Sequence, residues 1–222
     1  MNRAKNIQPV TVELLKESYL AKQMAIRARL AEFQAIYKTA DDIKLFEELV
    51  FCIFTAGASA RMGIKCIEKV RPVLLNGSES DILAAITGSH LYARDRAGYI
   101  VHTRNYLQQE CGLKMRQKLE SLTDREARRD FWASNKGVKG IGYKEASHFL
   151  RNIGYMGYAI LDKHILRSLH ELAVIDDPKP PTNKKKYLAI EKLMQEFAEI
   201  IKINFDELDL LLWSNKTGEI LK

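Results

Sequence analysis

The stretch G-V-K-G-I-G-Y-K-E-A-S-H-F-L-R-N, from Gly137 to Asn152, decides how the rest of the chain is interpreted. Its glycines crowd a short turn, and glycine permits positive φ and close approach of the backbone to a bulky group. A helix is predicted to begin at Tyr143, so free N–H groups and the positive end of the helix dipole point outward at the turn. Such a turn can hold a phosphate. The alternative is a glycine-rich connection between two helices that binds no ligand.

A lysine and an aspartate are placed where they could act together beside this turn. Lys144 lies on the first turn of the predicted helix, so its amine would project close to whatever the turn binds. Asp162 is the predicted N-cap of the helix in L-D-K-H-I-L-R, where a carboxylate is held by capping. It would lie beside the amine if the two helices pack together. The ordinary alternatives are a solvated lysine and a simple helix cap.

Helical periodicity extends through nearly the whole chain. Apolar residues recur at three-to-four spacing, whereas the alternation typical of strands is lacking. We therefore predict an all-α fold of about ten to twelve short helices, with a loop at Gly88–Arg94. The predicted helices are 11–38, 43–56, 59–70, 80–87, 97–109, 115–121, 124–134, 143–152, 163–173, 183–203 and 206–213.

The composition indicates a folded protein with an anionic partner. The chain has 222 residues, is 46% hydrophobic and carries a formal net charge of +7. This charge favours nucleic acid first and an anionic membrane surface second. The opening MNRAKNIQPV lacks the apolar region of a signal peptide, and no window of roughly eighteen apolar residues occurs. We expect a cytoplasmic, intracellular protein that makes no membrane contact.

Cysteine usage argues against a bound transition metal. The three cysteines, Cys52, Cys66 and Cys111, are widely spaced and form no C-x-x-C pair. The usual spacings of zinc and iron–sulfur sites are therefore missing. The odd number also speaks against a disulfide framework. We expect neither a transition metal nor an iron–sulfur cluster.

The motifs quoted above resemble a known superfamily of enzymes. G-V-K-G-I-G-Y-K followed by L-D-K-H-I-L-R resembles the helix-hairpin-helix DNA glycosylases that have a Gly/Pro-rich loop and an aspartate. Within it, K-E-A-S-H-F-L-R-N and the later L-D-L-L-L-W…G-E-I-L-K resemble the short 8-oxoguanine DNA glycosylase/lyase of archaea and some bacteria. The resemblance is densest in Asn135–Arg167 and Asp206–Lys222. It implies two helical domains, residues 41–155 and residues 1–40 with 156–222, and DNA bound at the cleft between them.

The resemblance also implies a mechanism. The protein would be a bifunctional glycosylase/AP lyase that flips 8-oxoguanine out of duplex DNA and excises it. Lys144 would be the nucleophile that forms a Schiff base and permits β-elimination. Asp162 would stabilise the developing oxocarbenium charge. The partner would be duplex DNA containing oxidised guanine, and a monomer suffices for this chemistry.

Contacts to the DNA backbone are implied at the hairpin and beyond it. The N–H groups of Gly140 and Gly142 are expected to hold a phosphate, and His164 to contact DNA or buttress the site. We expect no cofactor other than a possible K⁺ or Na⁺ ion at the hairpin. Its ligands would be the backbone carbonyls of Lys136, Val138 and Ile141.

Two further groups of residues would handle the flipped base and the gap it leaves. Trp213, Asp209 and the terminal carboxylate of Lys222 are expected to form the base pocket, although Trp213 has the spacing of a core residue. For the gap, the loop at 89–94 offers Leu91 and Tyr92 as wedges. Arg94 could contact the orphaned cytosine or a phosphate, although surface residues without such a role are the ordinary reading.

The sequence leaves two other functions open. The pocket is harder to read than the catalytic pair, so another oxidised base, such as thymine glycol, is a possible substrate. The chain could also be a non-catalytic helix-hairpin-helix module that binds DNA. In that case Lys144 would be a helix lysine and Asp162 only a cap.

Overall fold

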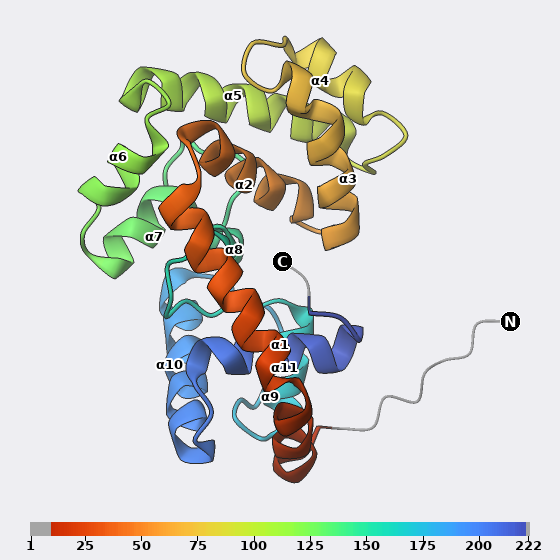
Figure 1. Cartoon of the computed structure of the whole chain (residues 1–222), viewed down its shortest axis with the longest axis vertical. Coiled ribbons are helices and arrows are strands. Elements are labelled where there is room, and N and C mark those ends of the chain that lie inside the picture. The colour runs from red at the N-terminus through yellow and green to blue at the C-terminus, as the bar shows by residue number, and fades with distance from the viewer. Residues whose placement is uncertain (1–9, 221–222) are drawn as a thin grey trace, which may run out of the picture. The chain divides into compact units, whose positions relative to one another are not determined.

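The computed structural model describes residues 10–220, which form eleven α-helices, one 3-10 turn and no strand (Figure 1). The all-α prediction is therefore confirmed. The elements are α1 (Val12–Thr39), α2 (Asp42–Thr55), α3 (Ala60–Val70), η1 (Arg71–Val73), α4 (Glu79–Ile86), α5 (Ala93–Cys111), α6 (Met115–Ser121), α7 (Arg125–Ala133), α8 (Tyr143–Asn152), α9 (Lys163–Glu171), α10 (Lys184–Ile201) and α11 (Phe205–Thr217).

The chain divides into two compact units. Phe33–Tyr155 form one, called here the hairpin unit because it contains the glycine turn and α8. The chain up to Glu32, together with the chain from Met156 onward, forms the other, called here the aspartate unit because it contains Asp162. Helix α1 contributes residues to both units.

Helix α2 is the centre of the hairpin unit. All of its residues from Leu45 to Thr55 are buried, because α3, α5, α6 and α8 pack against it. Trp132 of α7 and Phe149 of α8 meet edge to face, with ring centroids 5.0 Å apart. This aromatic contact fixes the two helices on either side of the glycine turn to one core.

In the aspartate unit, α11 packs against both α9 and α10. The first part of α1 is tied to α11 through Glu207, whose carboxylate accepts from the Tyr19 hydroxyl at 2.5 Å and from Arg27 at 3.0 Å. The run Leu210–Leu212 is buried, so α11 is a core helix of this unit.

Side-chain caps explain why several helices begin where the sequence predicts. Asp41 accepts the Lys44 N–H at 2.7 Å, and Ser59 accepts the Met62 N–H at 3.2 Å. Asp162 caps α9 in the same way. Each of these side chains satisfies a backbone donor that the first turn leaves unpaired.

Two boundary predictions were wrong. The predicted loop at Gly88–Arg94 ends early, because α5 begins at Ala93 and Arg94 lies in its first turn. Nothing at Ala93 or Arg94 opposes helix, and the Arg96 N–H already bonds to the Tyr92 carbonyl at 3.0 Å. Helix α11 runs past Trp213 to Thr217, where Gly218 ends it with φ of 82°.

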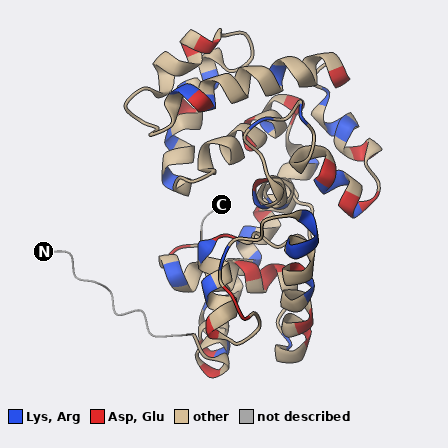
Figure 2. Ribbon diagram, turned by 180° about the vertical axis from the view of Figure 1, so that it is seen from behind, with Lys and Arg blue, Asp and Glu red and all other residues tan. Residues whose placement is uncertain are grey.

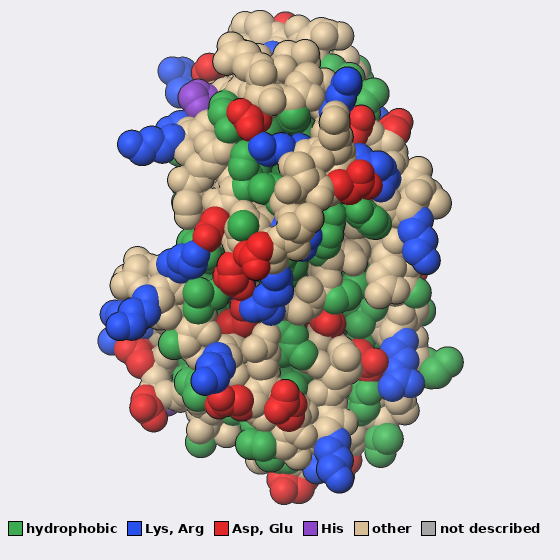
Figure 3. Space-filling model, turned by 90° about the vertical axis from the view of Figure 1, so that its left-hand side faces the viewer, with side chains coloured by type: hydrophobic (Ala, Val, Ile, Leu, Met, Phe, Trp, Pro, Cys, Tyr) green, Lys and Arg blue, Asp and Glu red, His purple; other side chains and the backbone are tan. Residues whose placement is uncertain are grey.

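Charged residues of both signs occur along the helices of both units (Figure 2). On the face shown in Figure 3, basic, acidic and hydrophobic side chains are intermixed, and no continuous basic patch covers it. On this face, attraction of a polyanion would depend on individual basic groups and not on a continuous patch. Among the described helices, none is long and apolar enough to cross a membrane.

Candidate active site

The glycine turn joins α7 to α8 and needs glycine at its centre. Gly140 has φ of +75°, a conformation that L-residues rarely adopt. A Cβ there would lie 2.7 Å from Cδ2 of Tyr99, so the neighbouring helix α5 leaves it no room. The sequence predicts that a bulky group approaches the backbone at this turn, and in the structure this group is the aromatic ring of Tyr99.

The turn is fastened to α5 by hydrogen bonds that sequence reasoning missed. The buried Thr103 hydroxyl accepts the Lys139 N–H at 2.9 Å. Asn135 accepts the Gly137 N–H at 2.9 Å and donates to the Tyr106 hydroxyl at 2.7 Å. The partners of the two bonds to α5 are 36 and 29 residues apart in sequence, and no local pattern signals such a pairing. The turn is thus tied to α5 by contacts within the protein itself.

Lys144 lies on the first turn of α8, as predicted, and its amine is paired. Its Nζ is 2.8 Å from Oε1 of Glu145, with the two side chains 29% and 14% exposed. The other oxygen of the same carboxylate accepts the N–H of Gly142 at 3.2 Å. Of the two N–H groups expected to hold a phosphate, that of Gly142 is therefore already engaged by Glu145.

Asp162 is the N-cap of α9 and uses only one of its oxygens for that role. Oδ1 accepts the N–H of His164 at 2.7 Å and that of Ile165 at 2.9 Å. No hydrogen bond from the described residues reaches Oδ2. The carboxylate is thus oriented by the helix end and still presents one oxygen.

The loop that leads into Asp162 is held by buried side-chain acceptors. Glu191 accepts the Ala159 N–H at 2.8 Å, and Asp209 accepts the Ile160 N–H at 3.0 Å. Both carboxylates are buried. Because buried backbone donors need partners, these two acidic residues position the segment before the aspartate. Asp209, predicted as a base reader, has this contact within its own unit.

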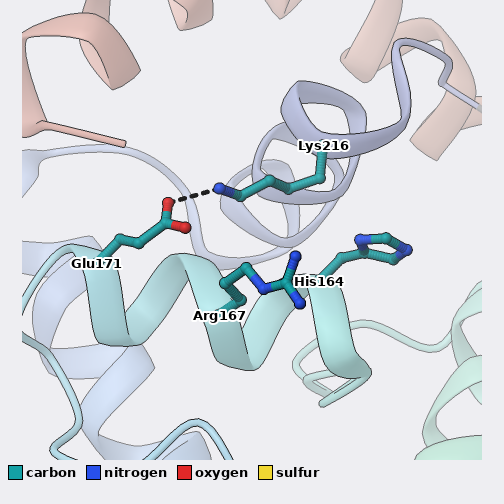
Figure 4. A pocket seen from close by; sticks show the side chains of 4 residues that line it. All are labelled: His164, Arg167, Glu171 and Lys216. Carbon is teal, nitrogen blue, oxygen red and sulfur yellow. Dashed lines mark hydrogen bonds and ion pairs between the residues drawn. The ribbon is translucent and has the colours of Figure 1, made fainter. Parts of the chain in front are cut away.

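A cavity of ≈ 100 Å³ lies between α9 and α11 in the aspartate unit, lined by His164, Arg167, Glu171 and Lys216 (Figure 4). The first three side chains lie along one face of α9, and Lys216 reaches in from α11. Lys216 is 3% exposed and pairs with Glu171 at 2.5 Å. Of these four residues the sequence predicted only His164 as a site residue, because Lys216 meets the residues of α9 only through the packing of α9 on α11.

The acidity of two cavity residues is shifted by their surroundings. Burial lowers the pKa of the His164 imidazole, with Asp162 opposing the shift and Lys163, Arg167 and Lys216 adding to it. The lowered pKa favours the neutral form of the imidazole. Burial alone would raise the pKa of Glu171, but hydrogen bonds from Lys216 and the Val10 N–H bring it below its usual value. The other basic side chains that line the cavity are those of Arg167 and Lys216.

The other predicted site residues come from both units and differ in exposure. Trp213 is partly exposed on α11, while Lys222 lies outside the described residues. In the hairpin unit, Leu91 and Tyr92 are 79% and 47% exposed, and Arg94 is exposed beside them.

The loop that carries Leu91 and Tyr92 is rigidly attached. The buried ring of His90 accepts the Tyr92 N–H on Nδ1 at 3.0 Å, and its Nε2 lies 2.8 Å from the Phe54 carbonyl oxygen. Leu91 is thus an exposed apolar side chain on a turn that these hydrogen bonds hold in place.

The hairpin carbonyls fit a hard cation in their chemistry. Among the hydrogen bonds of the described residues, none is accepted by the backbone oxygens of Lys136, Val138 or Ile141. Oxygen ligands of this kind suit K⁺ or Na⁺. No group of three or more His, Cys, Asp or Glu side chains within residues 10–220 is placed to hold a metal ion.

An all-α fold, a glycine hairpin, a lysine on the next helical turn and an aspartate capping a later helix are the features of the helix-hairpin-helix DNA glycosylases. The chain belongs to the 8-oxoguanine DNA glycosylase family within this class, whose family model matches residues 26–203. The resemblance predicted from the sequence is confirmed.

Relatives and solved structures extend over almost the whole chain. The 8-oxoguanine DNA glycosylase/AP lyase of Methanocaldococcus jannaschii is 36% identical over 212 residues, covering 95% of this chain and 97% of that protein. That of Korarchaeum cryptofilum is 37% identical over 198 residues, covering 89% and 90%.

The crystal structure of the Methanocaldococcus jannaschii enzyme with a 15mer DNA containing 8-oxoguanine has a TM-score of 0.84 at 34% identity, covering 95% of this chain and 100% of that one. The Thermotoga maritima 8-oxoguanine DNA glycosylase has a TM-score of 0.83 at 30% identity, covering 95% of this chain and 98% of that one.

Proposed function

We propose that this protein is a bifunctional DNA glycosylase/AP lyase that excises 8-oxoguanine from duplex DNA. The observation that carries the proposal is the position of Lys144, on the first helical turn after the glycine hairpin, in a chain of this family. The relatives named above are called 8-oxoguanine DNA glycosylase/AP lyases, and one of them was crystallised with DNA containing 8-oxoguanine. The protein would be cytoplasmic and would associate with the nucleoid when it acts on DNA. A monomer suffices for this activity.

Lys144 would supply the nucleophile. Its unprotonated amine adds to C1′ of the damaged nucleotide, while the bond from C1′ to the base breaks and its electron pair leaves with the base, which takes up a proton. Opening of the sugar ring gives a Schiff base between Nζ and C1′, with O4′ released as a hydroxyl. Loss of a C2′ proton then expels the 3′ phosphate by β-elimination. A side chain without an amine at this position, or a blocked amine, would stop both steps.

Asp162 would stabilise the positive charge that develops on the sugar. Its Oδ1 is occupied by the end of α9, so Oδ2 is the oxygen we assign to this role. A carboxylate that is already oriented needs no reorganisation as charge develops, which makes such groups effective in catalysis. Capping and catalysis are thus compatible in one side chain.

The hairpin would grip the DNA backbone near the lesion. The N–H of Gly140 is the better candidate for the phosphate, because that of Gly142 is engaged by Glu145. A K⁺ or Na⁺ ion held by the carbonyls of Lys136, Val138 and Ile141 would bring positive charge to the same phosphate. His164 and Arg167 would contact the backbone from the aspartate unit, where they line the cavity.

The flipped base and the gap need separate surfaces. Trp213 would provide a wall for the base, with Asp209 and the terminal carboxylate of Lys222 as polar contacts. Leu91 is the stronger wedge candidate for the gap, because it is the more exposed of the two and lies on a fixed turn. Tyr92 and Arg94 would flank it.

Borohydride trapping tests the proposal directly. The protein is mixed with duplexes that contain one 8-oxoguanine, one thymine glycol or no damage, and the Schiff base is reduced to a stable adduct. We expect an adduct on the 8-oxoguanine duplex and none on the undamaged one. The Lys144→Gln protein should form none.

Other outcomes would redirect the assignment. An adduct on thymine glycol alone would replace the substrate, and an adduct that persists in Lys144→Gln would replace the nucleophile. If the wild type forms no adduct on any duplex, the lyase activity is absent.

A further inference from the structure

Glu145 contacts both parts of the candidate site in the hairpin unit. Its Oε2 accepts the N–H of Gly142 at 3.2 Å, and its Oε1 lies 2.8 Å from Nζ of Lys144. One carboxylate therefore joins the glycine turn to the amine that we assign as the nucleophile.

We propose that Glu145 is a positioning residue that fixes the amine of Lys144 relative to the hairpin. The proposal rests on the nucleophilic role of Lys144 given above. Glu145 does not contact the reacting atoms in this assignment. It determines where the amine lies when the DNA backbone is held at the turn.

A capping role alone does not require the negative charge. Glutamine at the same position accepts the hydrogen bond from Gly142 as well as glutamate does. A carboxylate beside a phosphate-binding turn also repels DNA, since phosphate contacts dominate such affinities. The charge of Glu145 therefore opposes DNA binding at the turn, while it is favourable at the N-terminus of α8 and at Lys144.

The contact between Glu145 and Lys144 is partly shielded from solvent and can restrict the lysine. An N–H of the unprotonated amine can still donate to the carboxylate. The two side chains are 29% and 14% exposed, so solvent screens the pair less than it screens a surface pair. A free lysine side chain has several rotatable bonds and loses this freedom when it is held. A displacement of about 1 Å of a reacting group can cost roughly a hundredfold in rate.

The backbone around the pair is held as well. The hydroxyl of Tyr143 donates to Asp130 of α7, and Arg129 lies over the Tyr143 ring at 5.6 Å. The helix start that carries Lys144 is thus attached to α7 on one side and to the glycine turn on the other. Only the lysine side chain itself needs a further contact, and Glu145 supplies it.

The test separates the charge from the cap with Glu145→Gln, which keeps an acceptor for Gly142 and loses the ion pair. Single-turnover adduct formation on the 8-oxoguanine duplex, with protein in excess and at saturation, should slow about tenfold or more. The Kd for a duplex with a tetrahydrofuran abasic analogue should stay equal or fall. The melting temperature should stay close to that of the wild type, because a carboxylate charge at a helix N-terminus and a partly exposed ion pair each contribute little to stability.

Asp81→Asn is the matched control. Asp81 accepts the N–H of Ser78 at 2.8 Å at the start of α4, so it has the same capping position as Glu145. Within the described residues it forms no ion pair with a lysine. This variant should form adduct at the wild-type rate. Glu145→Ala, which loses both contacts, should be as slow as Glu145→Gln and should also melt earlier.

Two results would overturn the positioning role. One is a Glu145→Gln protein that forms adduct at the wild-type rate, which would leave only the cap. The other is slower adduct formation accompanied by weaker DNA binding and a lower melting temperature, which would indicate structural damage. A failure of the proposed function looks different, because then the wild type forms no adduct or Lys144→Gln still does.

Discussion

Asp162 and Gly140 are each placed by the backbone, the first through its side chain and the second through its lack of one. Asp162 uses Oδ1 to receive two N–H groups of α9, which fixes the direction of Oδ2. Gly140 adopts φ of +75° against the ring of Tyr99. At both positions folding and the proposed chemistry make separable demands on one residue, so substitutions can separate them.

Replacing Asp162 by Asn should abolish most of the chemistry and leave the fold intact. Asparagine caps a helix about as well as aspartate, but it carries no charge to stabilise the sugar cation. We expect single-turnover adduct formation to fall by about a hundredfold or more, with an unchanged melting temperature. Asp162→Ala should in addition lose about 1 kcal/mol of stability. An Asp162→Asn protein with wild-type rates would reduce the residue to a cap.

Replacing Gly140 by Ala should cost more stability than the same change at Gly57. Both glycines have nearly the same φ, +75° and +74°, but a Cβ at Gly57 meets nothing within 4 Å. The backbone strain of about 1–2 kcal/mol is therefore common to both variants. The contact with Tyr99 should add roughly 1–3 kcal/mol at Gly140 only. Urea unfolding measures both, and equal losses would show that the Tyr99 ring moves aside freely.

At the scale of helices and loops, features determined by neighbouring residues in the sequence could be predicted, whereas contacts between distant segments could not. The prediction of 143–152 for α8 was correct to the residue, because the glycines stop the preceding chain and Gly154 follows it. The prediction of Asp162 as a cap also held, since capping is a contact of neighbours. The contacts of Thr103, Glu191 and Lys216 could not be predicted. Each joins segments that only the folded chain brings together.

Helix α10 should influence the site through Glu191, although it carries no predicted site residue. Its buried carboxylate accepts the Ala159 N–H, three residues before Asp162. Glu191→Leu leaves that donor unpaired, which should cost about 1–3 kcal/mol and slow adduct formation by loosening the loop. The control is Glu196→Leu on the same helix, where the side chain is 52% exposed. Thermal melting and trapping should change in the first variant only, and matching behaviour of the two would exclude the loop effect.

For the whole molecule the net charge is +7, and on the face shown in Figure 3 the basic side chains lie among acidic ones. Long-range attraction by such a distribution is weak beyond about 8–10 Å at physiological salt. Specific phosphate contacts, in contrast, release bound counterions and give affinity a defined salt dependence. The two contributions can be separated by removing one positive charge at a predicted contact and one elsewhere.

Arg94→Gln and Lys192→Gln each lower the net charge by one, so a purely global effect of charge would weaken DNA binding equally. Arg94 is an exposed residue beside the Leu91 turn, whereas Lys192 lies on α10, is 76% exposed and pairs with Glu196 at 3.6 Å. We expect Arg94→Gln to reduce the slope of log affinity against log salt by about 1 and Lys192→Gln to leave it unchanged. Fluorescence anisotropy over a series of salt concentrations, with an 8-oxoguanine duplex and the Lys144→Gln background to prevent turnover, gives both slopes. Equal slopes would mean that Arg94 makes no phosphate contact and that the charge of the molecule acts only as a whole. A change in the affinity of Arg94→Gln at constant slope would favour the alternative role of Arg94 at the orphaned base.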